Sequence, residues 1–428
     1  TNRGGRAEPC PTATRPPNPW TARSDSSSTR MASSRSAATS SACAAIQAGS
    51  LMFDGVWIRI RPVRDAAASS RPSLIARWPS STSVTTRRTR AGGPVGVVLA
   101  HVGGGVPRNK PSVNAPTATG SSPRVASTRT SSVPRTLRTA AAAERFGAKF
   151  GIPHRHASYE ALVADSQVDV VYVATPNPMH RQNCLLCLEA GKHVLCEKPF
   201  AINSAEAEEM VTAAREKKLF LMEAMWSRFL PLMGRLRELL AREAIGELQL
   251  LSAELCIRFD FDPQDRRYSL DLGGGALLDL GIYPIALASM IMGPPSSITS
   301  AAHLGTTGVD EQTGLILGYD GGQISTLYCS IRGDSAVEAS VIGNMGRIHI
   351  HPWWIRPDAL TLSRDGHEDT IIKMPYDGEG YRFEASEVMA CLRAGRLESA
   401  LMSLDETLSI AQTLDTIRAQ IGLRYPME

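Results

Sequence analysis

Apolar residues in the second part of the chain recur at spacings that switch repeatedly between strand and helix periods. Three short runs have the apolar, β-branched character of buried strands: VDVVYVAT (168–175), HVLCEKP (193–199) and LFLMEAMW (219–226). Helical patterns stand before and between them: AAAAERFGAKFGI (140–152), SYEALVADS (158–166), HRQNCLLCLEAGK (180–192) and NSAEAEEMVTAAREKK (203–218). Strand and helix alternating at short intervals predict an α/β fold with a parallel, doubly wound sheet of the Rossmann type.

After about residue 246 the pattern changes to strands at hairpin spacing. A long alternating strand, GELQLLSAELCIRF (246–259), precedes a helix, GGGALLDLGIYPIALASMIMG (273–293). Further strands are SITSAAHL, TGLILGY, GQISTLYCS, AVEASVIG, GRIHIHP and DTIIKM, and two amphipathic helices follow at 382–395 and 403–422. We expect a C-terminal α+β domain with an open, mostly antiparallel sheet. Helices should cover one face, and the last helix should pack back on the Rossmann domain.

Residues 1–92 lack this patterning. They are mainly Ser, Thr, Arg, Ala and Pro in irregular order, and cannot bury enough surface to offset their ordering entropy. Residues 1–138 hold 20 Lys and Arg against four acidic residues, whereas residues 139–428 hold 26 basic and 38 acidic residues. Three interpretations stay open: a disordered extension, an artefact of a wrong reading frame or gene boundary, and an Arg-rich arm for nucleic acid. Nineteen of those twenty basic residues are Arg and interleaved aromatics are lacking, which favours the first two.

The patterns divide the chain into three parts. These are an extension over 1–92, a Rossmann dinucleotide-binding domain over 93–225 and a substrate and dimerisation domain over 226–428. Within the second part, residues 93–138 carry only a fragment of the expected pattern.

Composition also excludes several classes of protein. No run of eighteen apolar residues predicts a membrane span, and no secretory signal pattern begins the sequence. The eight cysteines form no spaced framework, so we expect a reduced, cytoplasmic setting. Cys184 and Cys187 make a C-x-x-C on a helical pattern without a second pair, so we expect core packing and no metal site.

Polar residues follow two of the predicted parallel strands, at the edge where doubly wound sheets bind ligands. ATPNPMH (174–180) opens a helix, and its Pro-rich turn can lay backbone against a flat ring. CEKP (196–199) follows the next strand, so Lys198 enters the same crevice, where it can hold ribose hydroxyls and stabilise a reacting group. An exposed strand-end charge would look the same. The residues predicted to bind coenzyme here are Thr175, Pro176, Asn177, His180, Glu197, Lys198 and Pro199.

A second group of residues lies in GGGALLDLGIYP (273–284). Asp279 and Tyr283 are four residues apart, so on a helix they share one face. A tyrosine presented to a lysine has the parts of a proton-transfer pair, because the ammonium favours phenolate and lowers the tyrosine pKa. The alternatives are a core tyrosine and a helix-surface carboxylate.

The ordered series FGIP, ATPNPMH, CEKPF, LMEAMWSRF, GGGALLDLGIYP and RAQIGLRYP resembles the Gfo/Idh/MocA oxidoreductase family over about 139–428. More narrowly, it is similar to the branch of dimeric dihydrodiol dehydrogenases and NADP-dependent D-xylose dehydrogenases, since most of the wider family has His where Tyr283 stands. The resemblance implies a Rossmann domain and a dimer-forming open sheet. It also implies Lys198 and Tyr283 as the catalytic pair, Asp279 as their support, Trp226 and Arg228 near the substrate, and a cis Lys198–Pro199 peptide.

By the same resemblance, a first strand and a G-x-G-x-x-G turn should precede this region. VGVVLAHVGGGV (95–106) occupies that place, with Gly103 and Gly105 as candidates, yet no helical period follows it. RVASTRT (124–130) is similar to the second-strand end that holds an NADP 2′-phosphate, through Ser127 and Arg129. Either a frame or gene-model error has altered this half, or the site has been lost.

We therefore predict an NADP-dependent dehydrogenase that acts as a homodimer, with NAD as the alternative coenzyme. Its substrate would be a small sugar such as D-xylose, or a trans-dihydrodiol. Nucleic acid and membrane are not expected as partners. A non-catalytic dinucleotide or sugar sensor, and an inactive fragment without a working nucleotide site, remain the alternatives.

A first prediction concerns coenzyme binding by the chain as printed. Because residues 107–138 offer no amphipathic helix, the phosphate-binding turn is incomplete, and a poor strand near 95–100 would leave neighbouring apolar surface exposed. We expect the chain to bind NADPH weakly or not at all, and to be poorly soluble. Calorimetry beside a chimaera that carries a relative's strand–G-x-G-x-x-G–helix unit over 93–138 tests this. Tight binding by the printed chain would contradict it.

Overall fold

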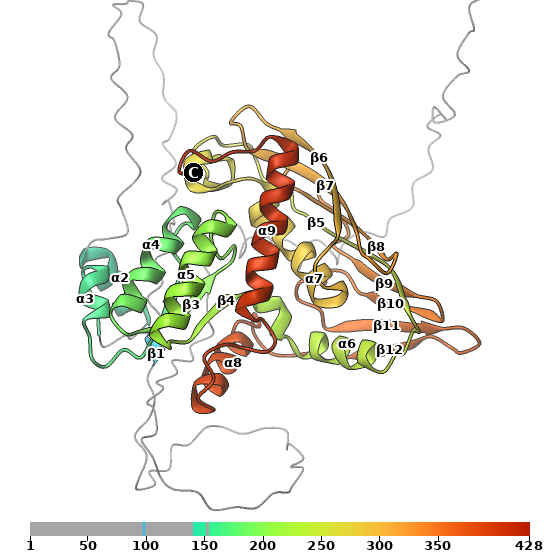
Figure 1. Ribbon diagram of the computed structural model, residues 1–428, viewed down its shortest axis with the longest axis horizontal. Helices are drawn as coiled ribbons and strands as arrows, with labels where there is room; N and C mark the ends of the chain where they lie inside the picture. Colours follow the sequence, from blue (N-terminus) through green and yellow to red (C-terminus); the bar gives the residue numbers. More distant parts are fainter. Residues whose placement is uncertain (1–96, 99–139, 151–153) are drawn as a thin grey trace, which may run out of the picture. The chain divides into compact units, whose positions relative to one another are not determined.

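The computed structural model describes residues 97–98, 140–150 and 154–428. Strands within these ranges form two sheets (Figure 1). One is a parallel four-stranded sheet in the order β1-β2-β3-β4, and the other is an eight-stranded sheet in the order β12-β11-β10-β9-β5-β8-β7-β6. The predicted α/β fold, with a Rossmann-type sheet and an open, mostly antiparallel sheet, is confirmed.

The first sheet and its helices follow the predicted alternation. In chain order the elements are β1 (Val97–Val98), α2 (Ala140–Phe150), α3 (Tyr159–Val163), β2 (Val170–Val173), η1 (Asn177–Met179), α4 (His180–Glu189), β3 (His193–Glu197), α5 (Ser204–Lys217) and β4 (Leu221–Ala224). Side chains cap two of these helices. Ser158 accepts a hydrogen bond from the Ala161 amide before α3, and Asn203 accepts one from the Glu206 amide before α5.

The predicted substitute for the first Rossmann strand is present as β1. Val97 pairs with Val170 and Val98 with Val171, in parallel register. These two residues are the part of the 95–100 stretch that the structure describes.

The second half begins with η2 and is built around the eight-stranded sheet. Its elements are η2 (Trp226–Phe229), α6 (Pro231–Ala241), β5 (Leu248–Cys256), η3 (Arg266–Tyr268), η4 (Leu270–Leu272), η5 (Leu277–Gly281), α7 (Ile282–Met292), β6 (Ser297–Leu304), β7 (Asp310–Gly318), β8 (Ile324–Ser330), β9 (Ala339–Gly343), β10 (Gly346–Ile350), β11 (Ala359–Arg364), β12 (Thr370–Lys373), α8 (Arg382–Arg393) and α9 (Leu404–Ile421). All ladders of this sheet are antiparallel except β5–β8.

Three elements differ from the sequence prediction. The helix expected over 273–293 is two pieces, a π-helical turn at η5 and then α7. Pro284 stands just after that turn and brings no N–H to the ladder, which gives a physical reason for the irregularity. Helix α6 and strand β11 were not foreseen, because α6 begins with a Pro-Leu-Met-Gly stretch and β11 is a short run between loops.

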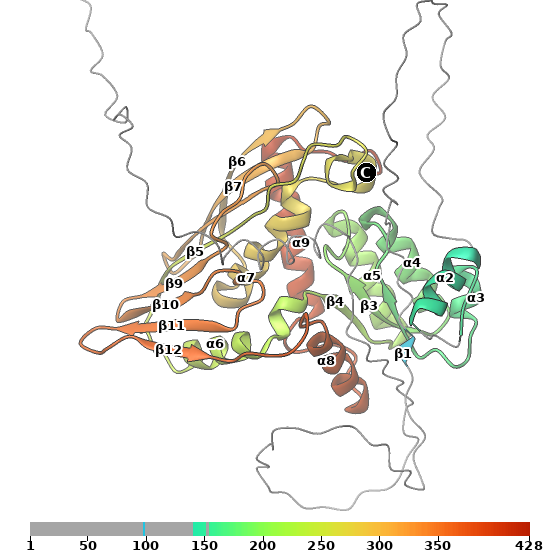
Figure 2. The ribbon, with the colours of Figure 1, turned by 180° about the vertical axis from the view of Figure 1, so that it is seen from behind.

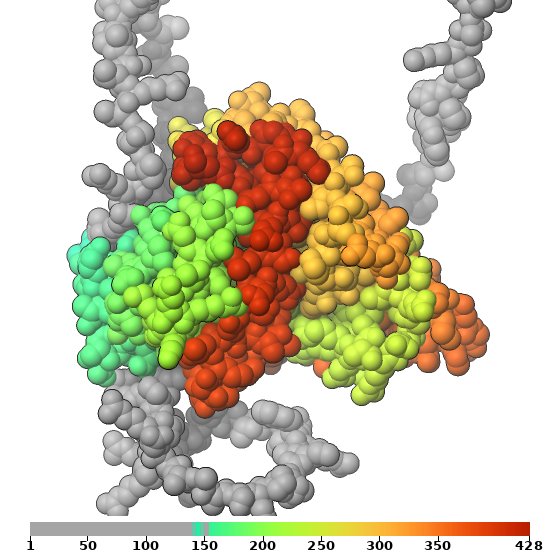
Figure 3. Space-filling model, viewed as in Figure 1, coloured from blue at the N-terminus to red at the C-terminus, as the bar shows by residue number. Residues whose placement is uncertain are grey.

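Helix α9 joins the two sheets, as predicted. Leu404 and Ala411 of α9 belong to the same buried cluster as Met210 of α5 and Val194 of β3. The same helix packs along β6 of the large sheet (Figure 2). In the space-filling view its surface runs as a continuous stripe between α5 and the large sheet (Figure 3).

The stretch Leu270–Met292 is long and apolar enough to cross a membrane by length and composition alone. Nearly three quarters of its most apolar window, 72%, is buried inside the structure, so we interpret it as a core helix. Cys184 and Cys187 are 0% and 3% exposed in the Rossmann core, as predicted for a packing role.

Candidate functional site

The site is made where the end of β3 meets the helix formed by η5 and α7. The Lys198 Nζ atom donates a hydrogen bond to the main-chain oxygen of Asp279 at 2.7 Å and lies 3.4 Å from Asp279 Oδ1. It also stands 4.7 Å from the centre of the Tyr283 ring. The three predicted catalytic residues are therefore brought together from segments 81 residues apart.

The Tyr283 hydroxyl has a second neighbour, Trp226 at the start of η2. The Trp226 indole N–H donates a hydrogen bond to the Tyr283 oxygen at 2.9 Å, and the two rings meet edge to face. Tyr381, just before α8, also packs against Trp226, with ring centres 4.8 Å apart and ring planes tilted by 44°. Trp226 therefore lies directly beside Tyr283, and no pattern in the sequence pointed to Tyr381.

Arg266 is a further site residue that sequence reasoning missed. Both of its terminal nitrogens lie 3.3 Å from the Asp279 carboxylate, and its side chain is 54% exposed. Asp279 is thus shared between Lys198, on the enclosed side, and Arg266, on the open side. The Asp-Arg-Arg run before the glycines resembles an ordinary solvated loop, so its composition held no hint of this contact.

Burial and charge shift the pKa values of these groups in different directions. Burial alone would raise the pKa of Asp279, but Arg266 and Lys198 hold it well below its ordinary value. Burial would lower the pKa of Lys198, but Tyr283, Asp279 and Glu197 raise it overall, so the amine is charged. Burial raises the pKa of Tyr283 more than Lys198 lowers it. The prediction of a lowered tyrosine pKa is wrong here, because the loss of water outweighs the ammonium's attraction.

The strand-end residues predicted to bind coenzyme lie beside this site, but not all face it. Asn177 donates to the main-chain oxygen of Gly273 at 3.4 Å, and Glu197 accepts hydrogen bonds from the Tyr172 hydroxyl and the Lys198 amide. Thr175 and Pro176 lie in the turn between β2 and η1. The Lys198–Pro199 peptide is cis, as the resemblance implied.

His180 and Arg228 are both buried and held by protein groups. His180 is fully buried, and its ring nitrogens lie 2.8 and 2.9 Å from the main-chain oxygens of Thr175 and Pro199. It therefore links the turn after β2 to the turn after β3. Arg228 is 3% exposed and is held by Glu406 at 2.6 Å and by the main-chain oxygen of Ala286 at 2.7 Å, which leaves it no open path to a substrate.

The four residues predicted to hold the coenzyme phosphates, Gly103, Gly105, Ser127 and Arg129, lie outside the described residues. The glycines at the other side of the site are described and have a clear role. Gly275 has φ +118° and a Cβ there would stand 2.2 Å from Asp310 Oδ1, while a Cβ on Gly274 would stand 2.5 Å from the Arg266 main-chain oxygen. A side chain at either position would clash with these atoms, so only glycine lets the chain approach the start of the helix this closely.

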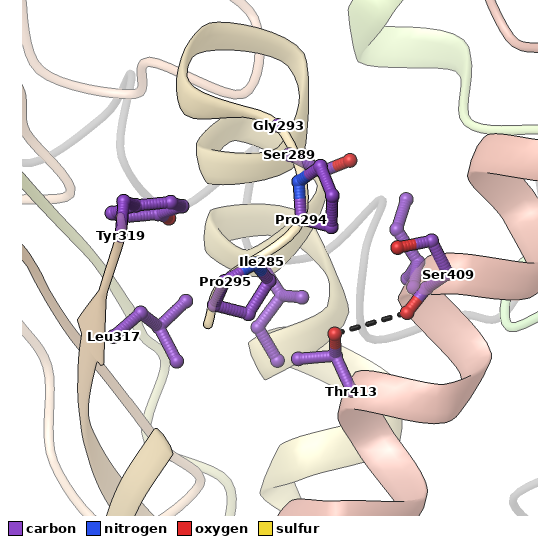
Figure 4. Close-up of a pocket in the computed structure, with 10 residues that line it drawn as sticks. Ile285, Ser289, Gly293, Pro294, Pro295, Leu317, Tyr319, Ser409 and Thr413 are labelled. Atoms are coloured by element: carbon purple, nitrogen blue, oxygen red, sulfur yellow. Dashed lines mark hydrogen bonds between the residues drawn. The ribbon is translucent and has the colours of Figure 1, made fainter. Parts of the chain in front are cut away.

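A small pocket elsewhere does not belong to this site. It lies between the end of α7, strand β7 and helix α9, and is lined by uncharged groups that include Ser289, Tyr319, Ser409 and Thr413 (Figure 4). Thr413 donates its hydroxyl to the Ser409 main-chain oxygen within it. None of the three predicted catalytic residues lines it.

Comparison with known proteins now assigns the chain to a family. Residues 131–225 match the model described as an oxidoreductase family with an NAD-binding Rossmann fold, and residues 233–349 match the GFO/IDH/MocA C-terminal domain. A trans-1,2-dihydrobenzene-1,2-diol dehydrogenase of Mus musculus is 40% identical over 296 residues, which are 67% of this chain and 87% of that protein. The chain belongs to the Gfo/Idh/MocA oxidoreductase family. The predicted family and enzyme class, a nicotinamide-dependent dehydrogenase, are confirmed.

Other relatives agree. The Homo sapiens protein of the same name is 38% identical over 294 residues, with 67% of this chain and 87% of that protein covered. Among solved structures, a 3-ketoreductase from Actinomadura kijaniata in complex with NADP and TDP-benzene has a TM-score of 0.59 and 27% identity, covering 66% of this chain and 87% of its own. An NAD binding oxidoreductase from Klebsiella pneumoniae has a TM-score of 0.60 and 25% identity, covering 67% and 86%.

A second prediction follows from the position of Arg266. The lowered pKa of Asp279 means that its carboxylate stabilises the fold above its ordinary value near 3.8, and that this stability is lost only as pH falls further, through the folded-state pKa. Arg266→Gln removes the largest lowering contribution, so the folded-state pKa of Asp279 should rise and the stability that this carboxylate contributes should shrink. Circular dichroism of acid unfolding should show the midpoint move upward.

The matched control is Arg235→Gln, which breaks an exposed pair with Glu238 on α6. Exposed pairs of this kind contribute little, so its acid unfolding should follow the wild type. Equal midpoints for the two variants would show that Arg266 does not hold Asp279 ionised.

Proposed function

We propose that the chain catalyses the reversible, NADP-dependent oxidation of a hydroxyl group on a small sugar or a trans-dihydrodiol. The observation that carries this proposal is the Lys198 ammonium held against Asp279 and over the Tyr283 ring. A non-catalytic sensor would have no need for a charged amine beside a buried tyrosine hydroxyl. Residues 93–225 would then bind coenzyme, and residues 226–428 would bind substrate.

The described residues fit the nicotinamide end of such a coenzyme. Lys198 and the turn at Thr175–Asn177 follow adjacent parallel strands, which is where doubly wound sheets bind dinucleotides. When bound, NADP supplies the carbon that accepts or returns the hydride. The choice of NADP over NAD rests on Ser127 and Arg129 as phosphate ligands and on the NADP-bound ketoreductase relative.

In the proposed reaction Tyr283 exchanges a proton with the substrate oxygen. In the oxidation, Tyr283 has to act as the phenolate: the substrate carbon loses a hydride to the coenzyme while the substrate hydroxyl proton passes to the Tyr283 oxygen, which becomes a neutral hydroxyl. In the reverse direction the Tyr283 hydroxyl gives that proton to the carbonyl oxygen. Burial raises the pKa of Tyr283, so the hydroxyl is in its proton-donating form. Lys198 and the Trp226 N–H would stabilise the phenolate in the oxidative direction.

The walls of the site bear on the substrate class. Trp226 and Tyr381 stack next to Tyr283, so a flat or cyclic carbon skeleton would meet aromatic surface there. Arg266 and Asp279 stand nearby as polar groups that a second hydroxyl could contact. Both a dihydrodiol and a cyclic sugar such as D-xylose have this combination of ring and vicinal hydroxyls.

The third prediction tests Tyr283. In the chimaera with an intact nucleotide half, Tyr283→Phe should lower kcat by roughly 10²–10⁴-fold, the usual size for a positioned acid–base group, with unchanged coenzyme affinity. Tyr319→Phe is the matched control, because it removes a buried hydroxyl bonded to Ser325 at the remote pocket. Steady-state kinetics over aldoses and cyclic diols would measure both. Near-normal turnover in Tyr283→Phe would remove this tyrosine from the mechanism.

We also propose that the chain forms a homodimer through the open face of the large sheet. Helices α7 and α9 lie on one face of that sheet. On the other face Leu250, Ile324 and Ile342 are neighbours across adjacent strands and are 36–42% exposed, with Ile316 and Tyr328 beside them at 52% and 47%. A contiguous apolar patch of this kind is typical of a protein interface.

The six described cysteines are free and buried, which supports the reduced, cytoplasmic setting we propose.

The fourth prediction concerns this face. Light scattering at micromolar concentration should report a dimer, and Ile316→Asp should convert it to a monomer, because the charge would be buried unpaired at the interface. Leu397→Asp, at a 38% exposed leucine of the loop between α8 and α9, should leave the dimer intact. A wild-type chain that is only monomeric would refute the proposal.

A further inference from the structure

Asp310, the first residue of β7, is a buried carboxylic acid outside the catalytic set. Its side chain has no exposed surface. Asp310 Oδ2 accepts two hydrogen bonds, from the Leu277 amide at 2.8 Å and from the Thr313 hydroxyl at 2.7 Å. Asp310 Oδ1 has no hydrogen-bond partner within the described part of the chain.

The Leu277 amide is special because it lies at the start of the helix that carries Asp279 and Tyr283. The first N–H groups of a helix have no partner inside the helix and need a cap. The residue before Leu277 is Ala276, which has no side-chain acceptor to offer. The cap is instead supplied by Asp310, 33 residues further along the chain and on a different element.

Further contacts are made by the three glycines just before this helix. Gly275 lies directly against Asp310 Oδ1, and the Gly274 main-chain oxygen accepts a hydrogen bond from the Tyr425 hydroxyl at 2.7 Å. Asn177 of the Rossmann turn contacts the Gly273 oxygen. Of these contacts, the one from Asp310 alone reaches a helix amide, so it fixes the helix itself and the others fix the loop before it.

We propose that Asp310 is a positioning residue, which sets the depth and orientation of Asp279 and Tyr283 by capping the first turn of their helix from β7. Asp279 is two residues after the capped amide and Tyr283 six, so a frayed first turn would displace the Lys198 contact first. This proposal rests on the proposed function for its effect on catalysis, but not for its effect on the helix.

The ionisation of Asp310 decides which substitution is informative. Burial raises the pKa of Asp310 to about 7, despite the hydrogen bonds from Thr313 and Leu277. The titratable groups that interact with it are Tyr425 after α9 and Cys329 of β8, and among the described residues no cation lowers its pKa. Asparagine keeps the acceptor oxygen and the volume of the acid, so Asp310→Asn should keep the cap, whereas Asp310→Ala removes it.

Hydrogen–deuterium exchange on the full chain tests the proposal without any coenzyme. Amides at 276–283 should exchange roughly tenfold faster in Asp310→Ala, as expected for a lost cap, and close to the wild-type rate in Asp310→Asn. Asp334→Ala is the matched control, because Asp334 also accepts a backbone hydrogen bond across elements, from the Arg258 amide at 2.8 Å, away from this helix. It should leave exchange at 276–283 unchanged.

Kinetics of the chimaera distinguish positioning from general stability. Asp310→Ala should lower kcat by roughly 10- to 100-fold with the coenzyme KM unchanged, and Asp310→Asn should restore most of it. If Asp310→Ala does not fold, Thr313→Val should show a smaller change in the same direction. Unchanged exchange at 276–283 in Asp310→Ala, or equal kcat in the Ala and Asn variants, would overturn the proposal. A chimaera that turns over no substrate would refute the proposed function and leave the exchange result to decide the capping role.

Discussion

A charged amine that is almost shut off from water has to be paired, and in this fold the partner of Lys198 belongs to the other half of the protein. Its side chain is 13% exposed, and the oxygen that it meets at 2.7 Å is the main chain of Asp279. An unpaired buried cation would be strongly unfavourable, so the two halves must dock closely wherever this lysine is enclosed. The Lys198–Asp279 contact therefore both shapes the site and holds the Rossmann edge against the C-terminal helix.

Several features exist to satisfy that requirement. The glycine run at 273–275 lets the chain pass against Asp310 and the Arg266 backbone, and so places the helix start at the docking point. Arg266 offsets the negative charge of Asp279 from the open side, so the carboxylate stays ionised beside Lys198. Trp226 fills the space beside Tyr283 and fixes its hydroxyl by a hydrogen bond. Tyr283 is therefore held between the Trp226 hydrogen bond and the Lys198 amine.

Periodicity and short motifs were enough to predict many of the helices and strands. Buried parallel strands such as 168–175 are recognisable because both faces are apolar, and Asn203 is recognisable as a cap because its side chain acts within three residues. The same local logic found Lys198, Asp279 and Tyr283 as candidates. It failed where a partner comes from far along the chain. The resemblance placed Arg228 near the substrate, and no local pattern showed that Glu406 and the Ala286 main-chain oxygen, both far from it in sequence, bind it. The pKa of Tyr283 depends on how deeply it is buried, which no pattern encodes.

Helix α9 has a consequence for the order in which the protein can be completed during synthesis. Leu404 and Ala411 fill the core of a sheet whose strands were made some two hundred residues earlier. Until this segment has been synthesised, the surface beside α5 and β4 that it covers presents apolar side chains to solvent. The nascent Rossmann half therefore reaches its final packing only after the last helix has emerged.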